Sequence, residues 1–98
     1  MVVNEKWYIK NSPIIGKKFR EFHDKTLESG VLDRKTKELL MAALAGAFRC
    51  RHCTEAHIKG ALEAGASKEE VAEALLIAAL EGAGTQLYWA EDIYEKYF

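Results

Sequence analysis

The segment 74–80 constrains the fold of this chain more than any other feature. It reads Ala-Leu-Leu-Ile-Ala-Ala-Leu, without one polar side chain. It follows Ser67 and Glu70, whose S-x-x-E spacing is a capping box and predicts a helix start. A helix that is apolar on every side must be buried on nearly every side. Because a chain of 98 residues forms only a thin core, we expect this helix to lie at a contact between subunits.

The rest of the chain is also typical of helices. It has seven Gly and one Pro, which is few for an all-β domain, and Ala, Leu, Glu and Lys are strong helix formers. No strand-like alternation is visible. The expected helices run from Ser12-Pro13 to about Leu27 with Gly30 as the stop, from Asp33 to about Phe48, from near Cys50 to Ala64, from Ser67 to before Gly82, and over 87–98.

We therefore expect an all-α bundle of about five to six helices. It forms one domain over residues 1–98 and an obligate oligomer. Residues 1–11 show no clear periodicity and form a poorly predicted N-terminal segment.

Charge and hydropathy exclude two classes of partner. Fourteen basic residues against fifteen acidic ones give a net charge of −1, whereas a nucleic-acid-binding domain usually carries a basic excess. The longest apolar run, 39–48, is shorter than the roughly 20 residues that span a bilayer. No apolar signal-peptide stretch follows Met1. We expect a cytoplasmic protein that binds neither nucleic acid nor membrane.

The chemistry-bearing segment begins at the chain's only two cysteines, Cys50 and Cys53. At the start of a helix they lie one turn apart, with Cα atoms about 5 Å apart, which a disulfide can bridge. His57 lies one further turn along the same face and can reach the Cys53 sulfur. The helix N-terminus favours a thiolate, and Arg49 and Arg51 add positive charge. This pattern favours a reactive cysteine with a nearby base.

An acidic residue is expected to face the same place. Glu38 shares a helical stripe with Ala42 and Ala45, and small residues also follow His57 on the next expected helix. Small residues on both helices allow close approach, which would place the Glu38 carboxylate near His57 or His52. A carboxylate bound to a histidine fixes its tautomer and raises its basicity.

Other interpretations of the cysteine segment remain open. The pair could be purely structural. The series Cys50, Cys53 and His57 also contains zinc-type ligands, but Cys50 and His57 are separated by about 10 Å of rise along a straight helix, and zinc holds its ligands at about 2.0–2.3 Å. A distorted helix start with Glu38 or His52 could still form a metal site. His52 alone reads equally well as a solvated histidine.

The combined motif resembles that of a known family. The alkylhydroperoxidase AhpD-like group of the carboxymuconolactone decarboxylase superfamily has a glutamate, eleven residues, and then Cys-x-His-Cys-x-x-x-His. Here the matching residues are Glu38, Cys50, His52, Cys53 and His57. The stretch 65–71, Gly-Ala-Ser-Lys-Glu-Glu-Val, is also similar to the family pattern. The resemblance covers roughly residues 12–90.

The resemblance implies a fold, an assembly and an activity. The fold would be an AhpD-like helical bundle, and single-domain members commonly form hexamers as trimers of dimers. Cys53 would be the peroxidatic cysteine of an antioxidant peroxidase and Cys50 the resolving one. His57 would help to deprotonate Cys53, with Glu38 and His52 completing a proton relay. A dithiol system such as a lipoyl-bearing protein would supply electrons, and no metal or other cofactor is implied.

Two functional alternatives accompany this expectation. The disulfide could serve a redox-sensing or interaction protein without small-molecule turnover. A decarboxylase-like or metal-binding member of the superfamily is the other, although true carboxymuconolactone decarboxylases lack the cysteine pair that this chain carries.

Overall fold

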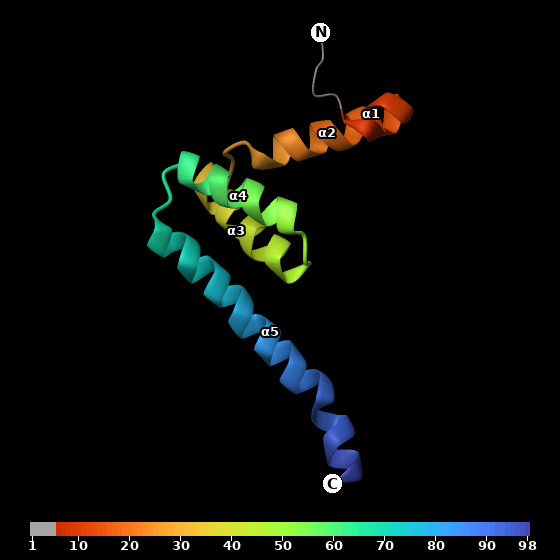
Figure 1. Ribbon diagram of the computed structural model, residues 1–98, viewed down its shortest axis with the longest axis vertical. Helices are drawn as coiled ribbons and strands as arrows, with labels where there is room; N and C mark the ends of the chain where they lie inside the picture. The colour runs from red at the N-terminus through yellow and green to blue at the C-terminus, as the bar shows by residue number, and fades with distance from the viewer. Residues whose placement is uncertain (1–5) are drawn as a thin grey trace.

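The computed structural model describes residues 6–98, and the regular secondary structure within them is α-helical (Figure 1). The helices are α1 (Trp7–Asn11), α2 (Pro13–Leu27), α3 (Arg34–Ala47), α4 (Arg51–Glu63) and α5 (Lys68–Tyr97). The described part has no strand, so the expected all-α class is confirmed, with five helices.

The centre of the fold is the pair α3 and α4, which lie side by side (Figure 1) and form the most extensive helix contact. Their facing surfaces are lined by small residues: Ala42 and Ala45 on α3 and Ala61 on α4 are all buried. Small side chains let the two helix axes approach closely. Val71 of α5 forms a buried apolar cluster with Ala61 of α4 and with Ala66.

The turn that joins α3 to α4 reverses the chain within three residues. Arg49 adopts a left-handed φ of 63°, and the N–H of Cys50 donates to the carbonyl of Ala45 at 2.9 Å. This is a Schellman ending, in which glycine normally occupies the left-handed position. Because Cys50 directly follows, it both closes α3 and caps α4.

α5 differs from the sequence prediction because it is one helix of 30 residues. Gly82 and Gly84 were expected to separate two helices, but neither has a positive φ. A glycine inside a helix costs only about 1 kcal/mol relative to alanine, which does not break so long a helix.

The start of α5 matches the expected capping box. Ser67 Oγ accepts from the Glu70 N–H at 3.0 Å, and a Glu70 carboxylate oxygen accepts from the Ser67 N–H at 2.9 Å. Lys35 of α3 donates to the other Glu70 oxygen at 3.0 Å. The pKa of Glu70 lies below its usual range, chiefly because of the hydrogen bond from the Ser67 backbone N–H and secondly because of the hydrogen bond from Lys35. These contacts attach the beginning of α5 to α3.

The N-terminal region departs from the expectation in two ways. Trp7–Asn11 forms the short helix α1, which no periodicity indicated, and residues 1–5 of the poorly predicted segment lie outside the described residues. Ser12 precedes α2, but its side chain makes no capping hydrogen bond. α2 ends at Leu27, and Gly30 is not the left-handed stop that we expected.

The single chain is extended rather than spherical. In Figure 1, α1 and α2 project from one side of the α3–α4 pair, and the C-terminal half of α5 projects from the other. The radius of gyration is 17.7 Å, against about 13 Å for a compact chain of this length. The accessible surface is 8259 Å², about one and a half times the roughly 5600 Å² of a compact monomer of this mass.

Much of the excess surface is apolar. In the segment 74–80, Leu76, Ile77 and Leu80 are 66%, 64% and 74% exposed. The same holds for the aromatic residues near the C-terminus, Tyr88, Trp89, Tyr94, Tyr97 and Phe98. One subunit therefore leaves the apolar face of α5 uncovered. Among residues 6–98, no helix combines the length and apolar character needed to cross a bilayer.

The two serines that precede helices provide a test of the local interactions. Ser67→Ala should lower the free energy of unfolding by about 1 kcal/mol, because it removes a capping bond. Ser12→Ala should change it by less than about 0.5 kcal/mol, since that side chain caps nothing. Denaturant unfolding at fixed protein concentration measures both. Equal losses in the two variants would contradict the capping assignment.

Candidate active site

The cysteine pair lies at the N-terminus of α4. Cys50 is the N-cap residue and Cys53 is in the first turn, with Cα atoms 5.2 Å apart and a disulfide between the sulfurs. The backbone N–H of Cys53 donates to Cys50 Sγ at 3.2 Å. Both residues are partly exposed. A backbone N–H of the first turn is thus directed at the Cys50 sulfur, where it would stabilise the negative charge of a thiolate.

Glu38 is the one charged side chain buried among residues 6–98, at 2% exposure. Its Oε2 lies 2.9 Å from His57 Nδ1 on α4, and its Oε1 accepts from Arg34 Nε at 2.9 Å. A buried charge is tolerated where its partners replace the lost water. The carboxylate therefore connects α3 to α4, as its position on the small-residue stripe predicted.

Gly60 gives this carboxylate its space. A Cβ built at Gly60 would lie 2.9 Å from Glu38 Oε1 and closer still to Oε2. Real Cβ atoms do not approach so closely, so only a glycine fits at this point of α4. The Glu38 carboxylate therefore packs directly against the backbone of α4 at Gly60.

The two histidines of the motif have different surroundings. The His57 side chain is 12% exposed and lies one helical turn after Cys53, on the same face of α4. His52 is exposed and makes no hydrogen bond to another residue in the described part of the chain. The structure thus places Glu38 and His57 together beneath the cysteine pair, and His52 on the solvent side of the helix start.

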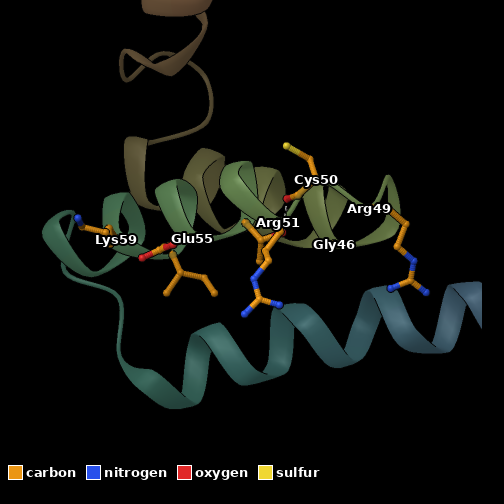
Figure 2. Close-up of a pocket in the computed structure, with 8 residues that line it drawn as sticks. Gly46, Arg49, Cys50, Arg51, Glu55 and Lys59 are labelled. Carbon is orange, nitrogen blue, oxygen red and sulfur yellow. Dashed lines mark hydrogen bonds between the residues drawn. The ribbon is translucent and has the colours of Figure 1, made fainter. Parts of the chain in front are cut away.

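A pocket of about 650 Å³ adjoins the helix start on the side that faces α5. Figure 2 shows Arg49 and Arg51 extending toward α5, whereas the Cys50 sulfur lies on the opposite side of the turn. The pocket is lined by Gly46, Arg49, Cys50, Arg51, Thr54, Glu55, Ile58 and Lys59. With three cationic side chains and one carboxylate, its lining is electropositive.

Sequence reasoning missed Arg34 as a member of the site. Its spacing of four residues before Glu38 was the available signal, because residues four apart meet on one helix face. The pattern could not single it out, since most such pairs are solvated. The left-handed backbone of Arg49 had no sequence signal at all, because glycine is the residue that normally marks it.

Metal ligation was an open alternative for this segment. Between residues 6 and 98, no three His, Cys, Asp or Glu side chains converge in a geometry that could hold a metal ion.

Comparison with known proteins relates most of the chain to one family. Residues 13–96 match the profile of the carboxymuconolactone decarboxylase family. A crystal structure from Methanobacterium thermoautotrophicum superposes with a TM-score of 0.81 and 34% identity, covering 89% of this chain and 98% of that one. A carboxymuconolactone decarboxylase family protein of Thermotoga maritima, described as a candidate for a part in the antioxidative response, has a TM-score of 0.64 and 28% identity, covering 86% and 94%.

One curated protein matches this chain over a shorter region. The uncharacterized protein 4 of the cox locus of Paracoccus denitrificans is 44% identical over 55 residues, which is 56% of this chain and 50% of that protein. The match thus spans about half the length of the curated relative.

Two glycines of the α3–α4 pair test the packing around Glu38. Gly60→Ala should cost about 1–3 kcal/mol of unfolding free energy, because the methyl group overlaps the carboxylate. Gly46→Ala, whose Cβ would meet nothing within 4 Å, should be neutral or stabilising by up to about 1 kcal/mol. Thermal or denaturant unfolding gives both values. A Gly60→Ala protein as stable as the Gly46→Ala protein would contradict the described packing.

Proposed function

This chain belongs to the carboxymuconolactone decarboxylase family, and we propose that within it the protein is a thiol-dependent hydroperoxide reductase. One observation carries the proposal: a cysteine pair that forms a disulfide lies at the start of α4, with the Glu38–His57 couple one turn below it. A thiol–disulfide cycle needs a stabilised thiolate, a base and access. The helix N-terminus, His57 and the partial exposure of Cys53 can supply these three requirements.

Cys53 is the peroxidatic residue in this proposal. His57 takes the thiol proton, and the Cys53 thiolate attacks an oxygen of the hydroperoxide. The O–O bond breaks, the alcohol leaves with a proton, and Cys53 becomes a sulfenic acid. Glu38 orients His57 and stabilises the imidazolium that forms. His52, on the solvent side, completes the exchange of protons with water.

Cys50 then resolves the intermediate. Its sulfur attacks the sulfenic acid, water leaves, and the Cys50–Cys53 disulfide forms. A dithiol reductant, such as a lipoyl-bearing protein, returns two electrons by thiol–disulfide exchange and leaves as its own disulfide. The Cys53 N–H that points at Cys50 Sγ stabilises charge on that sulfur when the disulfide opens, which makes Cys50 a better leaving group.

The chemical character of the relatives supports a redox role. The Thermotoga maritima protein is described in connection with an antioxidative response, and decarboxylation would give the cysteine pair no task. The cycle uses only these side chains and an external dithiol. A reducing cytoplasm would keep such a pair cycling rather than permanently oxidised.

The experiment is turnover of an organic hydroperoxide, such as cumene hydroperoxide, with dihydrolipoamide as reductant. Wild type should consume the hydroperoxide catalytically. Cys53→Ser should fall to the uncatalysed rate, because the nucleophile is lost, while keeping its circular dichroism spectrum and sedimentation behaviour.

A matched control is His23→Gln, because His23 lies on α2, with Nδ1 3.0 Å from Oδ1 of the neighbouring Asp24, and this variant should turn over like wild type. Full activity in Cys53→Ser would reject the proposed role of that residue. A wild-type protein that forms the disulfide but never cycles with a dithiol would instead favour a redox-sensing function.

We also infer that the protein works as a homo-oligomer, a hexamer built as a trimer of dimers by resemblance to single-domain relatives. Support comes from the apolar surface of α5, whose C-terminal half projects away from the other described helices (Figure 1). Other copies of the same chain are always present with it and could cover the apolar surface of α5. Their contact would bury the segment 74–80 on the sides that one subunit leaves open.

Leu80 tests this assembly because it is 74% exposed in a single chain. If Leu80 lies between subunits, Leu80→Glu should dissociate the protein and lower its thermal stability, since a charge would be buried in an apolar contact. Glu81→Gln, at the neighbouring exposed position, should sediment as wild type. Sedimentation at low micromolar concentration that finds a stable, folded wild-type monomer of 11.0 kDa would contradict the inference.

A further inference from the structure

The Glu38 carboxylate has a second partner whose role the proposed chemistry leaves open. Arg34, the first residue of α3, donates from Nε to Oε1 at 2.9 Å, while His57 Nδ1 lies 2.9 Å from Oε2. Each carboxylate oxygen therefore faces one ring or guanidinium nitrogen. The Arg34 side chain is 50% exposed and Glu38 2%, so the arginine connects the buried carboxylate to the surface.

The two partners differ in what they can do with a proton. The Arg34 guanidinium has only donors, so Glu38 Oε1 has to act as an acceptor. A proton on Oε1 would point at the Arg34 N–H and is therefore disfavoured. A proton on Oε2 would be donated to His57 Nδ1, and neutral His57 would then carry its own hydrogen on Nε2. In that tautomer, no ring nitrogen is free to take a proton from a thiol. Whether Glu38 Oε2 accepts or donates in its hydrogen bond with Nδ1 therefore decides whether His57 can act as a base.

We propose that Arg34 is a positioning residue that keeps Glu38 as an acceptor at both oxygens and so holds His57 in the tautomer with hydrogen on Nδ1. The Nε2 lone pair is then available for the Cys53 proton. This inference rests on the proposed function, because it gives His57 the role of base. It adds the reason why a buried carboxylate can perform its part without taking up the proton itself.

The surroundings of Arg34 support a positioning role. Its backbone N–H donates to Ser29 Oγ at 3.0 Å, and Asp33 before it caps α3 by accepting from the Thr36 N–H at 2.7 Å. These contacts fix the first turn of α3 and hence the start of the arginine side chain. On the far side, the carboxylate packs directly against Gly60 of α4, where an added Cβ would lie 2.9 Å from Oε1. The charge-assisted bond thus acts on a carboxylate with little freedom of its own.

The other two cations of α3 have partners elsewhere. On α3, Lys35 donates to Glu70 of α5 at 3.0 Å, and Lys37 donates to the carbonyl of Glu28. Arg34 is therefore the cation that the described structure assigns to Glu38.

Alkylation of Cys53 by iodoacetamide provides the test, carried out on the reduced protein in a Cys50→Ser background so that one thiol reacts. Arg34→Gln should slow alkylation at neutral pH about tenfold, the scale of one charge-assisted hydrogen bond. Arg34→Lys, which keeps the cation, should restore most of the rate. Arg20→Gln is the matched control, because Arg20 forms the same i, i+4 pair with Asp24 on the exposed surface of α2, at 3.4 Å, and should leave the rate unchanged.

A double-mutant cycle separates positioning from a structural effect. In a Glu38→Gln background, Arg34→Gln should have no further effect on alkylation, because the arginine acts through the carboxylate. An unchanged or faster rate in Arg34→Gln, or an equal loss with and without Glu38, would overturn the proposal. Absence of hydroperoxide turnover with these alkylation rates as expected would reject the reductase function and leave the role of Arg34 standing.

Discussion

The contact on which the site depends is the buried carboxylate of Glu38 between α3 and α4. It is held by His57 from one helix and by Arg34 from its own, and it fits only because Gly60 has no side chain. A buried charge without these donors would be strongly destabilising. The same contact therefore links the two central helices and orients His57, which lies one helical turn after Cys53.

The turn between these helices brings the cysteine pair to the same place. Cys50 closes the Schellman ending of α3 and caps α4, so the backbone that ends one helix positions the sulfur that begins the next. Arg49 pays the conformational cost of a left-handed position where glycine would be easier. The side chains of Arg49 and Arg51 both extend toward α5 and line the pocket there (Figure 2).

The outer helices have a different physical role. α1, α2 and the C-terminal half of α5 expose large apolar side chains and give the single chain a length of 63 Å. Such surfaces are stable in water when other subunits cover them. The contacts of Glu38 lie within one chain, whereas the exposed apolar surface lies on other helices. We therefore expect substitutions on the exposed face of α5 and at Glu38 to affect separate properties of the protein.

The sequence alone determined the helical class, the capped starts at Asp33 and Ser67, and the stripe that brings Glu38 toward His57. These follow from local spacing, because capping and helical periodicity depend on residues within a few positions of one another. Tertiary structure decided the rest. α5 continues through Gly82 and Gly84. A break there would lose several backbone hydrogen bonds, and that loss is larger than the free energy by which two glycines disfavour a helix. Arg34 differs from the other cations of the chain because its partner, Glu38, is buried. The burial of Glu38 depends on how α3 and α4 pack, which local sequence spacing does not determine.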